Sequence, residues 1–364
     1  MRLPVVDGNN ADIDYPRLEE MISYAMDHNV NYFDTARYYH EGNSESALGR
    51  VLRNYPRNRY YLTDKLPYQI WSASEPAKEM RMVFQDQLKQ CNTDYFDFYL
   101  FHSFQQNIYE ASKQYRSYEY LKQMQAEGRI RKIGFSFHSS PEVLKPILEE
   151  FEWDAVQLQL NYYDWDFLRV KEMYSLCVQH NVPVFVMEPV RGGNLLNISD
   201  ELAATIDSRY PNRSRAAWAL RWVASLPNVL VVNSGMSSLQ QLKENVDTLM
   251  VGFEPVSDEE TQIVEAMKAD IQRNTIVPCT GCRYCMDCPQ GVDIPRVFST
   301  LNDSLRVDIP FHAQINYGRF IPDDNKAHHC VSCGMCTPKC PQHIDIPKEL
   351  ASASEKLWLP NLSK

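Results

Sequence analysis

Short apolar runs alternate with longer amphipathic stretches over the first three quarters of the chain. The runs of strand length cover residues 31–33, 60–63, 96–101, 133–137, 155–160, 182–187 and 229–233. Seven or eight strand-helix units in roughly 250 residues are what a (β/α)8 TIM barrel requires, whereas a doubly wound open sheet normally has fewer. No glycine-rich dinucleotide fingerprint follows a strand, so the pattern favours the α/β barrel further.

Three stretches outside these runs carry helix signals. The first has an apolar stripe of helical period made of Leu18, Met21, Ile22, Ala25 and Met26. The second begins with Ser140 as a cap and Pro141 at its first position. The third opens with the capping box Ser257–Glu260. We therefore expect helices at all three places.

Eight of the ten cysteines form two runs in the last quarter. They are Cys279, Cys282, Cys285 and Cys288, and then Cys330, Cys333, Cys336 and Cys340. A proline follows the fourth cysteine of each run, as in double-cluster ferredoxins, where that cysteine binds the other cluster. We expect Cys340 to complete a [4Fe-4S] cluster with the first three, and Cys288 to complete the second. The first run closes as C-x2-C-P rather than C-x3-C-P, so ligation of Cys288 within its own run stays open.

Structural zinc and disulfides explain these cysteines less well. Zinc takes four thiolates in paired C-x2-C knuckles, which accounts for neither the third cysteine of each run nor the prolines. A chain of this size with no signal sequence needs no disulfides for stability. Cys91 and Cys177 fall in helical patterns and are interpreted as buried apolar residues.

Composition narrows the class of protein. The 364 residues are 44% hydrophobic and 12% aromatic, enough for one large core and a smaller appendage. The formal charge is −10, which argues against nucleic acid as a partner, because phosphate binding needs a basic face. No apolar run approaches the ~20 residues that cross a membrane. Reduced thiolates and oxygen-sensitive clusters indicate a soluble, cytoplasmic protein.

Polar residues follow three of the predicted strands. Asp34, Lys65 and His102 stand at strand ends, and Tyr39 lies in the loop just past Asp34. In a TIM barrel the carboxyl ends of the strands form the active site. A strand-end surface lysine and a core histidine are the alternatives, and three such residues on three strands make them less favoured.

These segments resemble the aldo/keto reductases. The matching residues are 33–39 with Gly42, Ser44 and Glu45; 63–65; 98–102; 134–136; Gln159 and Asn161; Glu188, Pro189, Gly192 and Gly193; and 234–237 with Gln241, Glu244 and Asn245. The resemblance covers nearly the whole chain. It includes the cysteine tail, which is similar to that of the subgroup with a fused ferredoxin-type extension.

The resemblance implies a catalytic tetrad of Asp34, Tyr39, Lys65 and His102. A carbonyl that receives hydride from a nicotinamide needs a proton at its oxygen, and a tyrosine can donate it when a lysine cation stabilises the phenolate. Asp34 would hold Lys65 charged and oriented, and His102 would donate to the carbonyl oxygen. If the loop register differs, Tyr38 is the acid instead of Tyr39.

The resemblance also implies a nicotinamide site. The carboxamide would lie near Ser136, Gln159 and Asn161. The last loop, 235–245, would hold the adenosine end through Gly235, Ser237, Gln241 and Asn245. Lys243 is the only cation of that loop, and without an arginine the preference for a 2′-phosphate weakens. NADP(H) is expected, with NAD(H) left open.

The first strand of the resembling proteins is mostly absent. Their first strand ends in a sequence similar to residues 1–4 of this chain, so we expect an open seam in the barrel there. The predicted organisation is a TIM barrel over residues 1–256, a connecting helix over 257–274, and a small, mainly α-helical ferredoxin-like domain with two [4Fe-4S] clusters over 275–364.

Two functional classes follow. The first is an oxidoreductase that reduces a small carbonyl compound or oxidises an alcohol with a nicotinamide, and whose clusters exchange electrons with a redox protein partner. The second is a barrel without turnover that serves as an iron-sulfur electron-transfer or structural module. The intact tetrad favours the first. A hydride carries two electrons and a cluster one, and the chain shows no flavin motif to convert between them.

Overall fold

The computed structural model describes residues 2–251, 253–273, 275–304, 313–314, 317–318 and 321–358. Met1 and the end of the predicted cluster domain after residue 358 therefore lie outside the described residues. The chain forms two compact units. The first contains Met1–Pro189 and Ala216–Val256, and the second contains Val190–Arg215 and Ser257–Lys364.

The first unit is built on a parallel sheet of seven strands. They are β1 (Tyr32–Asp34), β2 (Tyr61–Leu66), β3 (Phe96–Phe101), β4 (Ile130–Phe137), β5 (Ala155–Gln159), β6 (Val184–Met187) and β7 (Val229–Val232), paired in chain order. All seven predicted runs are strands. In register, Asp34 pairs with Thr63, and Lys65 pairs with Leu100. This register brings the carboxyl ends of β1, β2 and β3 to one edge.

The sheet is curled, as contacts between distant strands show. The ring of Tyr32 in β1 meets that of Phe185 in β6 at 5.4 Å, and Phe98 in β3 meets the same ring at 4.8 Å. Gln157 in β5 donates to Asp34 in β1 over 3.1 Å. Strands that are not neighbours in a flat sheet can make such contacts only across the interior of a barrel.

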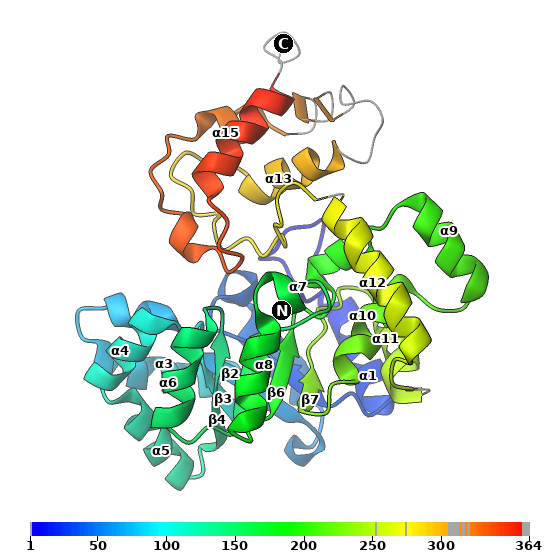
Figure 1. Ribbon diagram of the computed structural model, residues 1–364. Coiled ribbons are helices and arrows are strands. Elements are labelled where there is room, and N and C mark those ends of the chain that lie inside the picture. Colours follow the sequence, from blue (N-terminus) through cyan, green and yellow to red (C-terminus); the bar gives the residue numbers. More distant parts are fainter. Residues whose placement is uncertain are drawn as a thin grey trace. The chain divides into compact units, whose positions relative to one another are not determined.

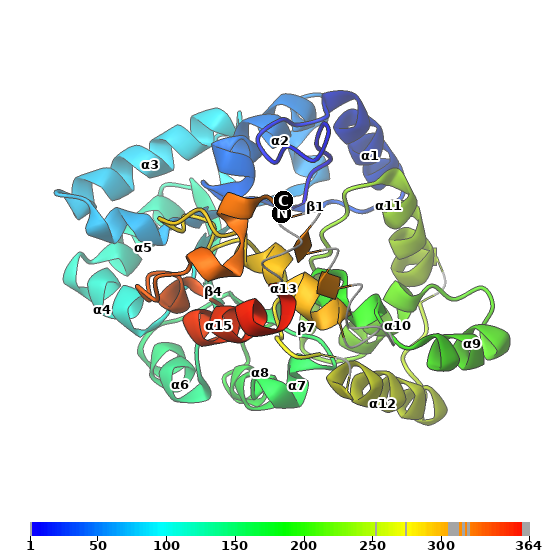
Figure 2. The same ribbon diagram turned by 90° about the horizontal axis from the view of Figure 1, so that it is seen from above.

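Helices surround this curled sheet (Figure 1). They are α1 (Tyr15–Asp27), α2 (Ser44–Leu52), α3 (Pro76–Gln90), α4 (Gln106–Gln114), α5 (Ser117–Ala126), α6 (Pro141–Glu150), α7 (Asp164–Phe167), α8 (Val170–Gln179), α10 (Arg215–Ala224) and α11 (Leu239–Val246). Seen from above, α1, α2, α3, α6 and α8 lie outside the strands (Figure 2). This layering of helices around parallel strands is that of a TIM barrel, as the sequence predicts.

The two edge strands, β1 and β7, are not paired with each other in the sheet described. The expected open seam is therefore present. Residues 2–4 precede an isolated antiparallel bridge between Val5 and Ile13. The segment is fixed by the Leu3 amide, which donates to His40 Nε2 over 2.9 Å.

The stripe predicted for α1 faces the core. All five of its residues are buried: Leu18, Met21, Ile22, Ala25 and Met26. Asp14 caps the helix by accepting from the Arg17 amide. Helix α6 begins after Ser140 with Pro141 at its first turn, as predicted, but the Ser140 side chain makes no cap hydrogen bond. The fixed φ of the proline favours the helix start without it.

Gly49 in α2 allows the close approach of α3, and we expect Gly49→Ala to destabilise the barrel. A Cβ atom there would lie 2.3 Å from the Gln90 carbonyl oxygen and 2.8 Å from Cys91 Cα. Alanine is normally the better helix residue, but overpacking against backbone costs about 1–3 kcal/mol. Thermal unfolding should show a midpoint several degrees lower, whereas Ser46→Ala in the same helix should change it much less. An unchanged midpoint in Gly49→Ala would contradict the close packing.

The second unit is mainly helical. Its longer helices are α9 (Asp200–Arg209), α12 (Asp258–Arg273), α13 (Ile294–Asp303) and α15 (Ile346–Leu357). The predicted capping box is present, because the Ser257 amide donates to Glu260 Oε2 and the Glu260 amide donates to Ser257 Oγ. Asp270 of α12 accepts from the amide and hydroxyl of Ser199, which joins segment 190–215 to this unit. Among the residues that the structure describes, no helix is long and apolar enough to span a bilayer.

Candidate active site and cluster-binding cysteines

Asp34 and Lys65 form a buried ion pair at the carboxyl ends of β1 and β2. Lys65 Nζ lies 2.6 Å from Asp34 Oδ1 and donates to the Thr35 carbonyl over 2.8 Å. The Lys65 side chain is 1% exposed and the Asp34 side chain is 13% exposed. The second carboxylate oxygen of Asp34 accepts from Gln157. With both oxygens engaged, Asp34 can hold the ammonium in one position.

Tyr39 and His102 complete the group of residues predicted from strand ends. Lys65 Nζ lies 4.8 Å from the centroid of the Tyr39 ring. That ring meets the imidazole of His102 edge-on, with centroids 5.8 Å apart. Tyr38, the alternative acid, is 51% exposed. The structure thus brings together Asp34, Tyr39, Lys65 and His102.

His102 is held as a neutral imidazole. Burial lowers its pKa well below the ordinary value, and the Lys65 cation lowers it further. Its backbone amide donates to the Leu66 carbonyl, which fixes the residue at the end of β3. Its Nδ1 is buried with no hydrogen-bond partner among the described residues. A neutral ring can donate from one nitrogen and accept at the other.

This depressed pKa gives a pH prediction. A histidine whose pKa is lowered in the folded state contributes stability above its unfolded pKa of about 6.5, and that stability is lost as the pH falls below it. We expect the free energy of unfolding of the wild type to fall more steeply between about pH 6.5 and 5 than that of His102→Gln. Urea titrations at a series of pH values measure this. His180→Gln, at the end of α8, should keep the wild-type slope. Equal slopes in wild type and His102→Gln would contradict the burial of a neutral His102.

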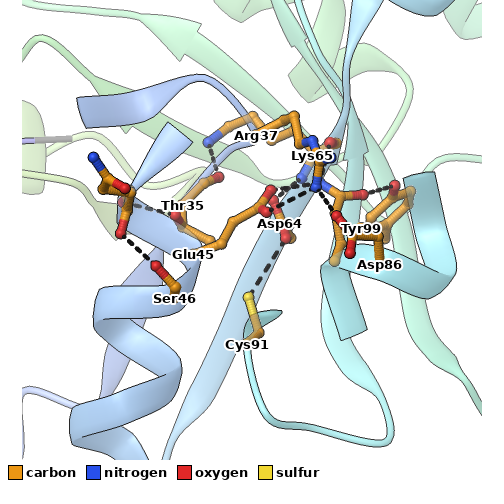
Figure 3. Close-up of polar contacts among 12 residues, drawn as sticks. Thr35, Arg37, Glu45, Ser46, Asp64, Lys65, Asp86, Cys91 and Tyr99 are labelled. Carbon is orange, nitrogen blue, oxygen red and sulfur yellow. Dashed lines mark hydrogen bonds and ion pairs between the residues drawn. The ribbon is translucent and has the colours of Figure 1, made fainter. Parts of the chain in front are cut away.

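A polar network lies behind Lys65 (Figure 3). Gln87 Nε2 donates to the Lys65 carbonyl and to Glu45 Oε1, and Tyr99 donates to Gln87 Oε1 over 2.5 Å. Asp64 accepts from the Lys65 amide over 2.8 Å. These contacts fix the backbone of the residue whose ammonium faces Asp34.

Buried acids belong to this network. Burial raises the pKa of Asp64 well above its usual range, and the negative charge of Glu45 raises it further. Burial likewise raises the pKa of Glu45. The Cys91 thiol donates a hydrogen bond to Asp64 Oδ2. Burial keeps the pKa of that thiol well above its usual value. Cys91 is thus a buried residue, and its thiol is held protonated.

Two of the three residues predicted to hold the nicotinamide carboxamide converge on an aspartate that the prediction missed. Gln159 and Asn161 both donate to Asp164 Oδ2, over 2.8 and 2.7 Å. Asn161 Oδ1 accepts from the amides of Tyr163 and Asp164. Ser136 Oγ accepts from the Ser103 amide over 2.8 Å. Asn161, Asp164 and Ser136 are almost fully buried, so these side chains are oriented by the protein itself.

The predicted adenosine loop, residues 235–245, is a loop only at its start, because residues 239–245 belong to α11. Ser238 caps this helix by accepting from the Gln241 amide, and Gln241 Oε1 accepts from the Ser237 amide over 2.9 Å. Asn245 donates to Ser234 Oγ. Gly235 is exposed and adjoins the Arg2 side chain, whose Cγ and Cδ would be 3.1 Å from a Cβ at that position. Arg2 is therefore a second cation beside this loop, in addition to Lys243.

Two buried polar atoms at strand ends have no hydrogen-bond partner among the described residues. They are His102 Nδ1 after β3 and Asn233 Nδ2 after β7. Buried polar groups are normally hydrogen-bonded, so orphaned ones at one edge of a barrel are expected where a ligand supplies the partner. The donor set at this edge therefore fits a polar ligand such as a nicotinamide.

In the second unit, one cavity is lined by four cysteines from both runs. They are Cys279, Cys282, Cys285 and Cys340. Burial raises the pKa of Cys279, and the neighbouring Cys340 raises it further. These are the four ligands that the crossed arrangement assigns to the first cluster.

Three of the cysteines assigned to the second cluster, Cys288, Cys330 and Cys336, influence one another electrostatically. Burial raises the pKa of Cys336, and the charges of Cys330 and Cys288 contribute in the same direction. Cys288 is therefore close to the second run despite its shortened spacing. Most of the cluster cysteines pack against the apolar core of this unit, which includes Val277, Phe298 and Leu350.

Family models match both parts of the sequence. The model of the aldo/keto reductase family covers residues 6–269. The chain belongs to the aldo/keto reductase family. A model of the 4Fe-4S dicluster domain covers residues 278–345. This aldo/keto reductase therefore has the fused ferredoxin-type domain that the cysteine spacing predicts.

Curated relatives of this reductase match most of its barrel. It is 26% identical over 255 residues to an uncharacterised oxidoreductase of Bacillus subtilis, covering 62% of this chain and 80% of that protein. It is 22% identical over 306 residues to an NADH-specific methylglyoxal reductase of Escherichia coli, covering 72% and 91%. It is 28% identical over 214 residues to an NADPH-dependent alpha-keto amide reductase of Saccharomyces cerevisiae, covering 57% and 66%.

Solved structures share the barrel. An aldo-keto reductase of Bacillus halodurans in its holo form is 24% identical, with a TM-score of 0.58 over 73% of this chain and 91% of that one. An aldo-keto reductase of Klebsiella pneumoniae in complex with NADPH is 22% identical, with a TM-score of 0.56 over 75% and 92%. These likenesses establish the fold of the barrel.

Proposed function

We propose that this aldo/keto reductase reduces small carbonyl compounds with a nicotinamide cofactor, and that Tyr39 is the general acid. The observation that carries the proposal is the group formed by Asp34, Lys65, Tyr39 and His102 at adjacent strand ends, with Lys65 Nζ 2.6 Å from Asp34 and 4.8 Å from the Tyr39 ring centroid. A cation fixed next to a tyrosine has a clear use in proton transfer.

The chemistry uses these residues as follows. A bound reduced nicotinamide supplies a hydride to the carbonyl carbon. Tyr39 donates its hydroxyl proton to the carbonyl oxygen as that oxygen gains charge. The Lys65 ammonium favours the resulting phenolate, and Asp34 keeps Lys65 in place. His102, neutral at physiological pH, donates a hydrogen bond to the same oxygen. In reverse, the Tyr39 phenolate removes the proton of an alcohol.

The nicotinamide would be held by residues already oriented by the barrel. Ser136, Gln159 and Asn161 would contact the carboxamide, with Asp164 orienting the last two. Gly235, Ser237, Gln241 and Asn245 would line the adenosine end. NADP(H) is the proposed cofactor, with NAD(H) left open, because the relatives include a reductase described as NADH-specific and another described as NADPH-dependent.

The second unit is proposed to carry two [4Fe-4S] clusters, each able to exchange one electron with a redox partner. Cys279, Cys282, Cys285 and Cys340 would bind one, and Cys330, Cys333, Cys336 and Cys288 the other. A structural role also has an observation in its favour, because the cysteines pack against the apolar core of this unit. Loss of a cluster is therefore expected to weaken that core as well as electron transfer.

The test uses anaerobically purified protein with its iron and sulfide measured. NADPH and NADH are titrated against it, and their oxidation is followed with a panel of small aldehydes and α-dicarbonyl compounds. We expect binding of at least one nicotinamide and oxidation that depends on the carbonyl. Absence of binding for both nicotinamides would overturn the proposal. Binding without oxidation across the panel, combined with intact clusters, would favour the barrel without turnover.

A further inference from the structure

Arg191 is a buried cation next to the first group of cysteines. It lies in the short 3-10 helix Arg191–Leu196, within the second unit, and is 2% exposed. Its Nη2 donates to the Pro278 carbonyl over 2.8 Å and to Gln342 Oε1 over 3.1 Å. Pro278 directly precedes Cys279, and Gln342 lies two residues after Cys340. The guanidinium thus bridges the two chain segments that supply ligands to one cavity.

A second side chain of the same helix ties it to the same cysteine. Asn194 Nδ2 donates to the Cys279 carbonyl over 2.6 Å. Arg191 and Asn194 therefore fix the two backbone carbonyl groups on either side of the Cys279 Cα atom, those of Pro278 and of Cys279 itself.

The other cations around this cavity are less effective. Arg283 and Lys339 line it, but Arg283 is exposed to solvent, and the Lys339 side chain is 32% exposed. Water screens such groups, whereas a charge in the interior is screened much less. Arg191 is therefore the cation whose field at these thiols is weakened least by solvent.

We propose that Arg191 raises the reduction potential of the cluster bound by Cys279, Cys282, Cys285 and Cys340. This inference rests on the proposed iron-sulfur ligation. Reduction adds one electron, and thus one negative charge, to a cluster already surrounded by four thiolates. Net charge, hydrogen bonding and solvent exposure set cluster potentials, and a buried cation favours the more negative, reduced state. Arg191 would thereby offset the burial of Cys285 and its neighbours, which disfavours added charge.

Potentiometric titration of the full-length protein, followed by electron paramagnetic resonance, tests this. In Arg191→Gln, the reduction equilibrium constant of the first cluster should fall about tenfold or more, which is about 59 mV per decade for one electron. The potential of the second cluster should stay the same. A Cys333→Ala background, in which only the first cluster should assemble, assigns the signal.

Two control variants separate charge from general disturbance. Arg191→Lys keeps the charge and should stay close to the wild-type potential. Arg215→Gln removes a partly exposed cation that donates to the Leu196 carbonyl, at the far end of the same segment, and should change neither potential. Should Arg191→Gln fail to load the first cluster, Gln342→Glu provides the second test. It places a carboxylate on the guanidinium and should lower the same potential.

The outcomes are distinguishable. An unchanged first-cluster potential in Arg191→Gln, or in Gln342→Glu if the former does not load, overturns the role of Arg191. An equal fall in Arg191→Lys and Arg191→Gln also overturns it, because geometry rather than charge would then be responsible. A wild-type protein without iron and sulfide would instead refute the cluster assignment on which the inference rests.

Discussion

Tyr39→Phe is expected to lower kcat for carbonyl reduction about a hundredfold to ten-thousandfold, which is the usual contribution of a positioned general acid. The variant keeps the aromatic ring beside Lys65 and His102 and removes only the hydroxyl that carries the proton. Binding of the nicotinamide should survive, because the residues proposed to hold it lie on β4, on and just after β5, in the loop before α11 and in α11 itself. A fall in kcat with an unchanged nicotinamide dissociation constant is therefore the expected signature.

Tyr38→Phe is the matched control. Tyr38 is the neighbouring residue and is 51% exposed, so its variant should keep wild-type activity. Loss of activity in Tyr38→Phe and retention in Tyr39→Phe would show that the loop adopts another register during turnover. Full activity in both would remove the tyrosine from the chemistry.

Removal of Cys340 is expected to abolish the cluster whose other ligands come from the first run. Cys340 lines the same cavity as Cys279, Cys282 and Cys285. Alanine replaces each cysteine in the test, because a serine oxygen can still bind iron. Iron should fall from about eight to about four atoms per chain in Cys340→Ala, as two four-iron clusters become one.

Paired variants reveal which cysteines share a cluster. With crossed ligation, Cys282→Ala together with Cys340→Ala removes ligands of one cluster, so about four iron atoms should remain. Cys333→Ala with Cys340→Ala should leave about none, because each variant then disables a different cluster. The reverse result would show that each run binds its own cluster. Cys177→Ala, a buried cysteine of α8 in the barrel, should keep the full iron content.

The strands and the meeting of Asp34, Tyr39, Lys65 and His102 were predictable because both depend on local patterns. Each strand is a short apolar run between helix-period stretches, and the barrel rule then places Asp34, Lys65 and His102 at one edge. The cysteine spacing is equally local. It implies crossed ligation, and Cys340 lines the same cavity as the first three cysteines.

The supporting residues were not predicted, because their partners are distant in sequence. Gln87 of α3 donates to Glu45 and Lys65 and accepts from Tyr99 of β3, through a packing of α3 against the barrel that no spacing shows. The sequence did contain a signal that Gln157 faces the barrel interior. Gln157 alternates with Gln159 in an otherwise apolar strand, so both point to the same inner face. Asp164 follows Asn161 by three residues, which gives it no signature of its own.

The grouping of segment 190–215 with the cluster-bearing unit was also beyond local patterns. In the sequence this segment simply follows β6 and reads as part of the barrel. Its attachment depends on Ser199 bonding to Asp270 and on Arg191 and Asn194 bonding to backbone around Cys279. Such contacts between residues about 70 to 90 positions apart arise only from tertiary packing.

The most direct test of the central claim is a deuterium-transfer experiment under anaerobic conditions. Nicotinamide cofactors labelled with deuterium at either face of C4 are mixed with the protein and the most active carbonyl of the panel, and the alcohol is analysed by mass spectrometry. We predict one deuterium at the former carbonyl carbon from one of the two labelled faces, and none from the other. Alcohol formed without deuterium from either face, or no alcohol at all from protein that binds the cofactor, would contradict hydride transfer by this barrel.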